Sequence, residues 1–220
     1  LPFDNTLKVL TTYLANFDSP MHVQKIKTLI VQTLQATSQY SEAYMVLKDI
    51  PSPSHNQKKA LQQLAFFLGV KEFNQQNFKE AITYFTHINE YPINDTYSYL
   101  SNFWLADCYF HLGDYRRSID GYNGLSVVVE GHLAGYEHLK KYNLAYSYFK
   151  AQDYVNSVRC FRSYEKNVSD SMKLNDTYLR IADGYFMNSD FSLSAKYYDK
   201  ALHCSLFDAD YALYQKSVSL

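Results

Sequence analysis

The stretch LADCYFHLGDYRRSIDGY, residues 105–122, decides the fold. It opens on a large residue followed by a small one, and near its end the small residue Ser118 lies between two tyrosines. These tyrosines stand three positions before Ser118 and four after it, so all three residues share one face of an α-helix. Between the apolar stretches stand Gly113 and Asp114, which are typical of a helix C-cap and a helix N-cap. The stretch therefore predicts two amphipathic helices joined by a tight turn.

The same landmarks recur along the whole chain at steps of 37 to 39 residues. Each small residue has an aromatic residue three positions before it and a bulky residue four positions after it. A period of this length is typical of a helical solenoid, in which each repeat is one pair of helices. The small residues are Thr6, Ala43, Ala81, Ser118, Ser157 and Ser194.

The turns inside the helix pairs carry a second regular feature. In four of them an Asn or Asp stands directly before the aromatic residue that opens the second helix, whereas the turn at Gln39 has none. Side chains of this kind accept a hydrogen bond from the free backbone N–H groups of a helix start. We therefore expect N-caps at Asn77, Asp114, Asp153 and Asp190.

In order and spacing, these landmarks resemble the tetratricopeptide repeat over nearly all of the chain. The stretch 105–122 matches the large–small pair, the aromatic residues and the turn of that repeat, although Ser replaces the usual Ala at Ser118, Ser157 and Ser194. The resemblance implies an all-α fold. The expected architecture is a right-handed superhelical solenoid of helical hairpins, with about five repeats and a partial helix at each end.

The unbroken period predicts that residues 1–220 form a single solenoid domain. Residues 1–20 would hold the second helix of a partial repeat, and residues 207–220 the first helix of another. Because the chain begins and ends inside repeats, we expect it to be a segment of a longer protein. The complete repeats are expected at residues 21–54, 55–93, 94–131, 132–170 and 171–206.

Composition restricts the classes of partner. The chain has 220 residues, with 21 Lys and Arg against 22 Asp and Glu, and no basic stripe is visible. A nucleic-acid partner is therefore not expected. No apolar run reaches the length of a membrane span, so we expect no direct membrane insertion by this segment. The sequence leaves the oligomeric state open.

Motifs for chemistry are sparse. The three cysteines, Cys108, Cys160 and Cys204, form no C-x-x-C pair, and none of the common nucleophile, metalloprotease or phosphate-loop patterns occurs. Cys108 and His111 make at most half of a metal site. We therefore expect a protein that is not an enzyme and that needs no cofactor or metal.

The concave face of such a solenoid is lined by the first helices of the repeats, and the resemblance implies that ligands bind there. Aromatic residues recur at the positions expected to face this groove, and aromatics are enriched at binding hot spots. An alternative for the recurring phenylalanines, Phe110 among them, is packing inside the solenoid. The candidate residues for a partner-binding groove are Phe66, Phe103, Asp107, Phe110, His111, Tyr142, Tyr146, Phe149, Asp183 and Phe186.

Three segments are also similar to long tetratricopeptide-repeat proteins of the Bacteroidetes cell envelope: residues 142–154, 176–186 and 210–220. Residues 13–20 resemble a helix end that is common in envelope lipoproteins with such repeats. This likeness implies a periplasmic or outer-membrane-associated protein, with a cytoplasmic location as the alternative.

The expected function is a scaffold that binds a peptide or partner protein along the aromatic groove, in a bacterial envelope assembly. Two alternatives stay open: a sensory or regulatory module of a larger signalling protein, and the substrate-binding region of an enzyme whose catalytic domain lies outside this segment. Glycan binding is a minor option, because the chain lacks the long loops that carry sugar-stacking residues.

Overall fold

The computed structural model describes residues 9–10, 12–13, 20–36, 39–50, 52–126, 131, 133–204 and 206–220, and every regular element among them is helical. Most of residues 1–20, where we expected the second helix of a partial repeat, lie outside this set. Contacts along the chain divide it into two compact units, Leu1–Cys108 and Tyr109–Leu220. The boundary falls inside one helix, and each unit is described by itself.

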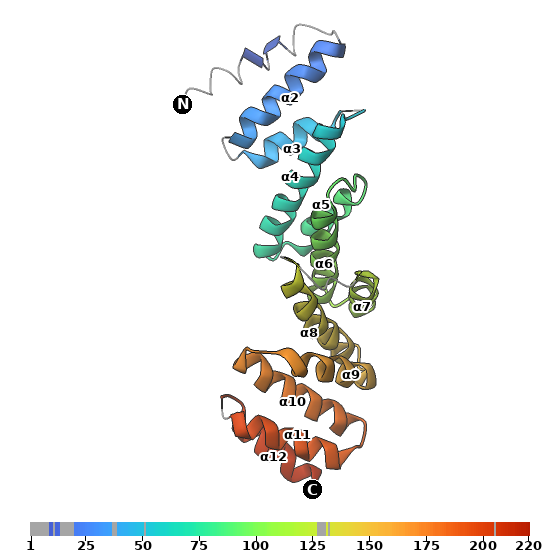
Figure 1. Cartoon of the computed structure of the whole chain (residues 1–220), viewed down its shortest axis with the longest axis vertical. Helices are drawn as coiled ribbons and strands as arrows, with labels where there is room; N and C mark the ends of the chain where they lie inside the picture. Colours follow the sequence, from blue (N-terminus) through green and yellow to red (C-terminus); the bar gives the residue numbers. More distant parts are fainter. Residues whose placement is uncertain are drawn as a thin grey trace. The chain divides into compact units, whose positions relative to one another are not determined.

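The first unit is a stack of paired helices (Figure 1). Helix α2 packs on α3, α3 on α4, and α4 on α5. The helices are α2 (Pro20–Ala36), α3 (Tyr40–Lys48), α4 (His55–Asn74), α5 (Phe78–Ile88) and α6 (Asp95–His111), the last of which continues into the second unit.

The second unit repeats the arrangement, and Figure 1 shows α10, α11 and α12 side by side. Each helix from α7 to α12 packs against the next one. Among the described helices, none is both long enough and apolar enough to span a membrane. The elements are α7 (Tyr115–Gly124), α8 (Ala134–Lys150), α9 (Tyr154–Tyr164), the short 3₁₀ helix η1 (Glu165–Asn167), α10 (Ser171–Met187), α11 (Phe191–Cys204) and α12 (Ala209–Ser219).

The landmark positions form the interior of the hairpins, as the period predicts. The five small residues from Ala43 to Ser194 are all 0% exposed, and the bulky residue four positions after each is at most 1% exposed. A small side chain lets two helices approach closely, and the bulky one fills the adjoining space. The bulky residues are Leu47, Phe85, Tyr122, Phe161 and Tyr198.

Serine replaces alanine at three of these positions without leaving a bare polar group. Ser157 Oγ donates to the carbonyl of Ala145 at 2.9 Å, and Ser194 Oγ donates to the carbonyl of Ala182 at 3.0 Å. Both acceptors belong to the large–small pair of the first helix in the same hairpin. A buried hydroxyl without a partner would be destabilising, so these bonds explain why serine is tolerated there.

Two glycines on first helices also allow close approach: Gly69, from a large–small pair, faces α5 of its own hairpin, and Gly184 faces α9 of the preceding hairpin. A Cβ atom added to Gly69 would lie 2.6 Å from the Phe85 ring, and one added to Gly184 would lie 2.5 Å from Val158 Cγ2. Atoms at such distances would overlap, so a side chain at either position would push the neighbouring helix away.

The turns inside the hairpins share one backbone conformation. Gln76, Gly113, Gln152 and Ser189 all have φ between 61° and 79°. The residue after each one donates its N–H to a carbonyl five positions earlier, at 2.9 Å in every case. This pattern is the Schellman C-cap, in which the left-handed residue is usually glycine. The sequence indicated it only at Gly113.

The predicted N-caps are confirmed at three of four positions. Asp114, Asp153 and Asp190 each accept a hydrogen bond from the backbone N–H three residues later, at 3.1, 3.1 and 3.3 Å. The prediction is wrong for Asn77, whose side chain makes no cap bond. Its amide instead donates to Glu72 Oε2 at 2.9 Å, because a glutamate on the preceding helix lies within reach.

The left-handed backbone conformation of Gln76 can be tested by substitution. A non-glycine residue in the left-handed region costs about 1 kcal/mol or more, so Gln76→Gly should raise the free energy of unfolding by about 0.5–1 kcal/mol. The neighbour Gln75 has φ of −85°, so Gln75→Gly should give no gain. Urea denaturation followed by circular dichroism measures both, and equal effects would contradict the assigned turn.

Candidate functional site

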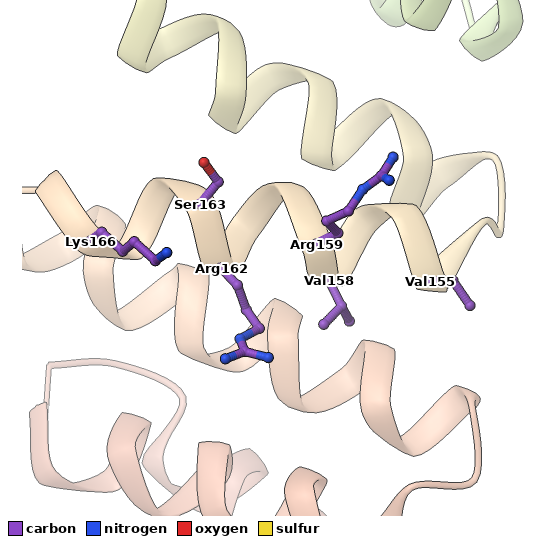
Figure 2. A pocket seen from close by; sticks show the side chains of 6 residues that line it. All are labelled: Val155, Val158, Arg159, Arg162, Ser163 and Lys166. Atoms are coloured by element: carbon purple, nitrogen blue, oxygen red, sulfur yellow. The ribbon is translucent and has the colours of Figure 1, made fainter.

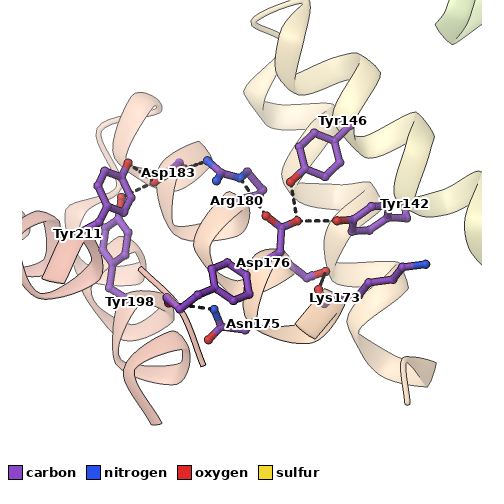
Figure 3. Close-up of polar contacts among 11 residues, drawn as sticks. Tyr142, Tyr146, Lys173, Asn175, Asp176, Arg180, Asp183, Tyr198 and Tyr211 are labelled. Atoms are coloured by element: carbon purple, nitrogen blue, oxygen red, sulfur yellow. Dashed lines mark hydrogen bonds and ion pairs between the residues drawn. The ribbon is translucent and has the colours of Figure 1, made fainter. Parts of the chain in front are cut away.

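Two features of the second unit are candidates for function. One is a pocket along α9 (Figure 2), to which we return below. The other is a set of hydrogen-bonded side chains that joins α8, α10, α11 and α12 (Figure 3). We call the second one the tyrosine–carboxylate cluster, and its members are Tyr142, Tyr146, Asp176, Arg180, Asp183, Tyr198 and Tyr211.

One half of the cluster joins α8 to α10. Tyr142 and Tyr146 lie one turn apart on α8, and their ring centroids are 5.1 Å apart in an edge-to-face arrangement. Both hydroxyls donate to Oδ2 of Asp176, at 2.7 Å from Tyr142 and 2.5 Å from Tyr146. Because Asp176 belongs to the next hairpin, these bonds fix one repeat against the following one.

Arg180 connects this half to the other. Its Nε donates to Asp176 Oδ1 at 3.4 Å, and its Nη1 donates to Asp183 Oδ2 at 2.7 Å. The three residues are spaced four and three apart on α10, so the helix itself places them on one face. The rigid, planar guanidinium suits two carboxylates at once.

The other half surrounds Asp183, which is only 7% exposed. Its Oδ1 accepts hydrogen bonds from Tyr198 at 2.6 Å and from Tyr211 at 2.8 Å, while Arg180 occupies Oδ2. Figure 3 shows the two tyrosines approaching from α11 and α12. A buried carboxylate is costly unless it is paired and hydrogen-bonded, and here every partner comes from the chain itself.

The electrostatics of the cluster keep its phenols protonated. Burial raises the pKa of Tyr142 and of Tyr146 above the usual range of tyrosine, and the Asp176 carboxylate raises both further. Burial likewise raises the pKa of Tyr198 and Tyr211, followed in each case by the interaction with Asp183. At neutral pH the four hydroxyls are therefore donors to carboxylates rather than candidate bases.

Two of the cysteines, Cys108 and Cys160, are not activated nucleophiles either. Burial raises the pKa of Cys108 to about 12, with a contribution from Asp107, and burial also raises the pKa of Cys160. Within the described ranges, no group of three or more His, Cys, Asp or Glu side chains is placed to hold a metal ion. The site offers aromatic surface, a guanidinium and hydrogen-bonding groups.

Of the predicted groove residues, the structure brings Tyr142, Tyr146 and Asp183 into the cluster. Phe66 belongs to the first unit, where its ring lies 5.1 Å from that of Tyr97. On α6, Asp107 is partly exposed and His111 is exposed.

The recurring phenylalanines pack within their own hairpins. Phe110 lies 5.6 Å from Tyr115, Phe149 lies 5.4 Å from Tyr154, and Phe186 lies 5.4 Å from the aromatic that opens α11, measured between ring centroids. Each pair closes the turn end of a hairpin, which is a structural role. The three phenylalanines remain partly exposed.

Two of the predicted residues are buried, which corrects the expectation that they line an open groove. Phe103 is 0% exposed. Asp183 is nearly buried, and its carboxylate is occupied by Arg180, Tyr198 and Tyr211. The repeat register gave the helix face of each side chain, but it did not give how deeply that side chain is buried.

Sequence reasoning did not single out Asp176, Arg180, Tyr198 or Tyr211. A signal for the first two was available, because Asp176, Arg180 and Asp183 place alternating charges on one face of a helix. Tyr198 was identified only as a bulky core residue. Its hydroxyl donates a hydrogen bond to Asp183 on the adjacent helix. The spacing of residues in one sequence does not show that contact.

Comparison with known proteins shows the fold. No protein-family model matches the sequence, and no curated protein matches it. The apo form of RapI is similar at a TM-score of 0.62 and 13% identity, over 97% of this chain and 64% of RapI. BtubC (BKLC) from P. vanneervenii is similar at a TM-score of 0.60 and 13% identity, over 93% of this chain and 91% of that one.

A third similar structure is described as containing a tetratricopeptide repeat. It is a STAND signal-transduction ATPase with a tetratricopeptide repeat sensor from Pyrococcus horikoshii, with a TM-score of 0.51 and 16% identity, over 97% of this chain and 34% of that one. This chain thus spans less than two thirds of RapI and about a third of the ATPase. The fold is that of tetratricopeptide-like helical repeats, as the landmarks indicated.

The bond between Tyr198 and Asp183 provides a test of the cluster. Tyr198→Phe removes one donor from a buried carboxylate, and a hydrogen bond to a charged group contributes about 2 kcal/mol. We expect a loss of that size in the free energy of unfolding measured with urea. Tyr214→Phe is the matched control, because Tyr214 is 67% exposed. If both variants are as stable as the parent, the bond contributes nothing.

The raised pKa values of the cluster predict a loss of stability in alkali. Folding favours the protonated phenols of Tyr142 and Tyr146, so their contribution is complete below the ordinary tyrosine pKa of about 10 and is lost as the pH rises above it. The double variant Tyr142→Phe/Tyr146→Phe should lose stability less steeply above pH about 10. Equal slopes in urea denaturation across this range would contradict the assignment.

Proposed function

We propose that this chain is a non-catalytic interaction module that binds an extended segment of a partner protein along the first helices of its second unit. The observation that supports this most directly is the continuity of the tyrosine–carboxylate cluster. All of its side chains except Tyr198 come from three successive first helices, α8, α10 and α12, and hydrogen bonds connect them across the repeats. A segment lying across these helices would meet one connected surface.

The composition of this surface suits a protein partner. Tyr142, Tyr146 and Arg180 are each partly exposed, and tyrosine and arginine are among the residues enriched at binding hot spots. Their positions are already fixed by Asp176 in the unbound chain. Side chains that are ordered before binding lose less entropy on binding, which favours affinity.

Two cations lie over aromatic rings at the edges of the cluster. The Lys173 ammonium is 5.8 Å from the centroid of the Tyr142 ring, and the Arg180 guanidinium is 5.8 Å from that of Phe149. A partner could place apolar side chains against these rings and direct its backbone carbonyl groups to the two cations. An extended peptide offers both kinds of group at regular intervals.

The place of this module in a cell is a finer proposal. The resemblance of residues 142–154, 176–186 and 210–220 to envelope repeat proteins supports a scaffold in a bacterial envelope assembly. The cluster itself is equally compatible with a sensory module or with the substrate-binding region of a larger enzyme. These alternatives differ in the partner that the surface holds, so identifying a binding segment is the first step.

Peptide selection tests the proposed surface. A random peptide library displayed on phage is selected against the chain, and the affinities of the enriched peptides are measured by calorimetry. Lys173→Glu reverses the charge beside Tyr142 and should weaken these peptides by about tenfold or more. Lys196→Glu makes the same change at an exposed position on α11 and should leave the affinities unchanged.

Circular dichroism confirms that both variants are folded before the comparison. Enriched peptides that bind the Lys173→Glu variant as tightly as the parent would show that the ligand surface lies elsewhere. Failure to enrich any peptide would count against a peptide-binding function for the first helices of this unit.

A further inference from the structure

A pocket of about 400 Å³ runs along α9, one of the second helices of the repeats. Its lining residues recur every three or four positions and so lie on one face of α9 and η1. None of them is a member of the tyrosine–carboxylate cluster. Figure 2 shows these side chains along the helix. They are Val155, Val158, Arg159, Arg162, Ser163 and Lys166.

Three cations line this pocket, and all of them are exposed: Arg159, Arg162 and Lys166. Among the described residues, none of the three forms an ion pair with a carboxylate. Arg162 donates a hydrogen bond to the neutral hydroxyl of Tyr185 at 3.3 Å. Positive charge is therefore concentrated here, and the nearby Glu165 offsets it only in part.

The acidic residue in this stretch of sequence, Glu165, has other partners. Its Oε1 accepts a hydrogen bond from Tyr197 at 3.1 Å, and its Oε2 lies 3.7 Å from Lys200 Nζ. Its side chain is 16% exposed, so it is held against α11. It offsets only part of the charge of the three cations.

The other repeats show that the fold does not need cations at these positions. In the register of the small residues, Thr83 and Thr86 of α5 and Glu90, just after it, stand where α9 and η1 have the three cations. Helix α7 has Asp120 and Asn123 at the first two of these positions. A helix that packs in the same way tolerates neutral and acidic side chains there, so packing does not explain the basic triad of α9.

We propose that the α9 pocket binds a short acidic peptide segment of a partner protein, with its carboxylates held by Arg159, Arg162 and Lys166. Arginine forms strong, charge-assisted hydrogen bonds with carboxylates. The site is independent of the surface proposed above, since the two share no residue. It gives the second unit a separate interaction surface, selective for negative charge.

The arrangement of the side chains favours an extended segment over a single small anion. Figure 2 shows Arg159 and Arg162 on opposite sides of the α9 axis, with Lys166 further along the helix. Side chains of an extended peptide alternate between two sides, so successive acidic residues could meet the two arginines in turn. Val155, which is 68% exposed, offers an apolar contact at the other end of the pocket.

Fluorescence anisotropy with a labelled octaglutamate peptide tests the proposal. Replacing all three cations, Arg159→Gln/Arg162→Gln/Lys166→Gln, should weaken binding by about tenfold or more. The control Lys79→Gln/Arg116→Gln/Lys196→Gln removes the same amount of charge from exposed positions on other helices, and it should bind like the parent. Because all six side chains are exposed, both variants are expected to fold, which circular dichroism verifies.

Two further measurements decide the chemistry of the ligand. Octaglutamine should not bind, and added salt should weaken the binding of octaglutamate, as expected for contacts between charges. Equal affinity of octaglutamate for the parent, the triple variant and the control would overturn the proposal. Binding of phosphatidylserine vesicles that depends on the three cations, without binding of octaglutamate, would overturn it in favour of an anionic membrane surface.

Discussion

The close approach of the two helices in each hairpin is the constraint on which the other features depend. The residues from Ala43 to Ser194 at the landmark positions are completely buried, and a methyl group added at Gly69 would overlap the Phe85 ring of the facing helix. A contact this tight fixes the rotation of each helix about its axis. The rotation in turn decides which side chains of α8 and α10 reach the surface and meet Asp176.

Serine at the contact adds a polar element to this packing. The hydroxyls of Ser157 and Ser194 donate to the carbonyls of Ala145 and Ala182. These bonds fix how far one helix of a hairpin is shifted along the axis of the other, as well as the distance between them. The tyrosine–carboxylate cluster then joins one hairpin to the next. Apolar contacts therefore set the spacing in this unit, while directional hydrogen bonds set the register between repeats.

The parts that could be predicted from the sequence are those fixed by local spacing. The helix pairs, their buried small residues and the caps at Asp114, Asp153 and Asp190 follow from a period that is visible in the sequence. Contacts across hairpins were not predictable, because residues distant in the sequence, such as Asp183 and Tyr211, meet only in the folded chain. The complete burial of Phe103 was likewise not visible in the repeat register. The basic face of α9 was not predicted, because its cations are three and four positions apart in the sequence and come together only on the surface of the helix.

The two candidate surfaces of the second unit differ in how their charges are balanced. In the cluster, Arg180 faces Asp176 and Asp183, so the charges are largely neutralised and what remains exposed is aromatic surface held in fixed positions. On α9, Arg159 and Arg162 form no ion pair with a carboxylate in the part of the chain that the structure describes. A surface with balanced charge selects by shape and apolar contact, whereas one with unbalanced charge attracts and selects by charge. One unit could thus engage two different features of a partner at the same time, and linking two weak contacts in this way raises the overall affinity beyond that of either one.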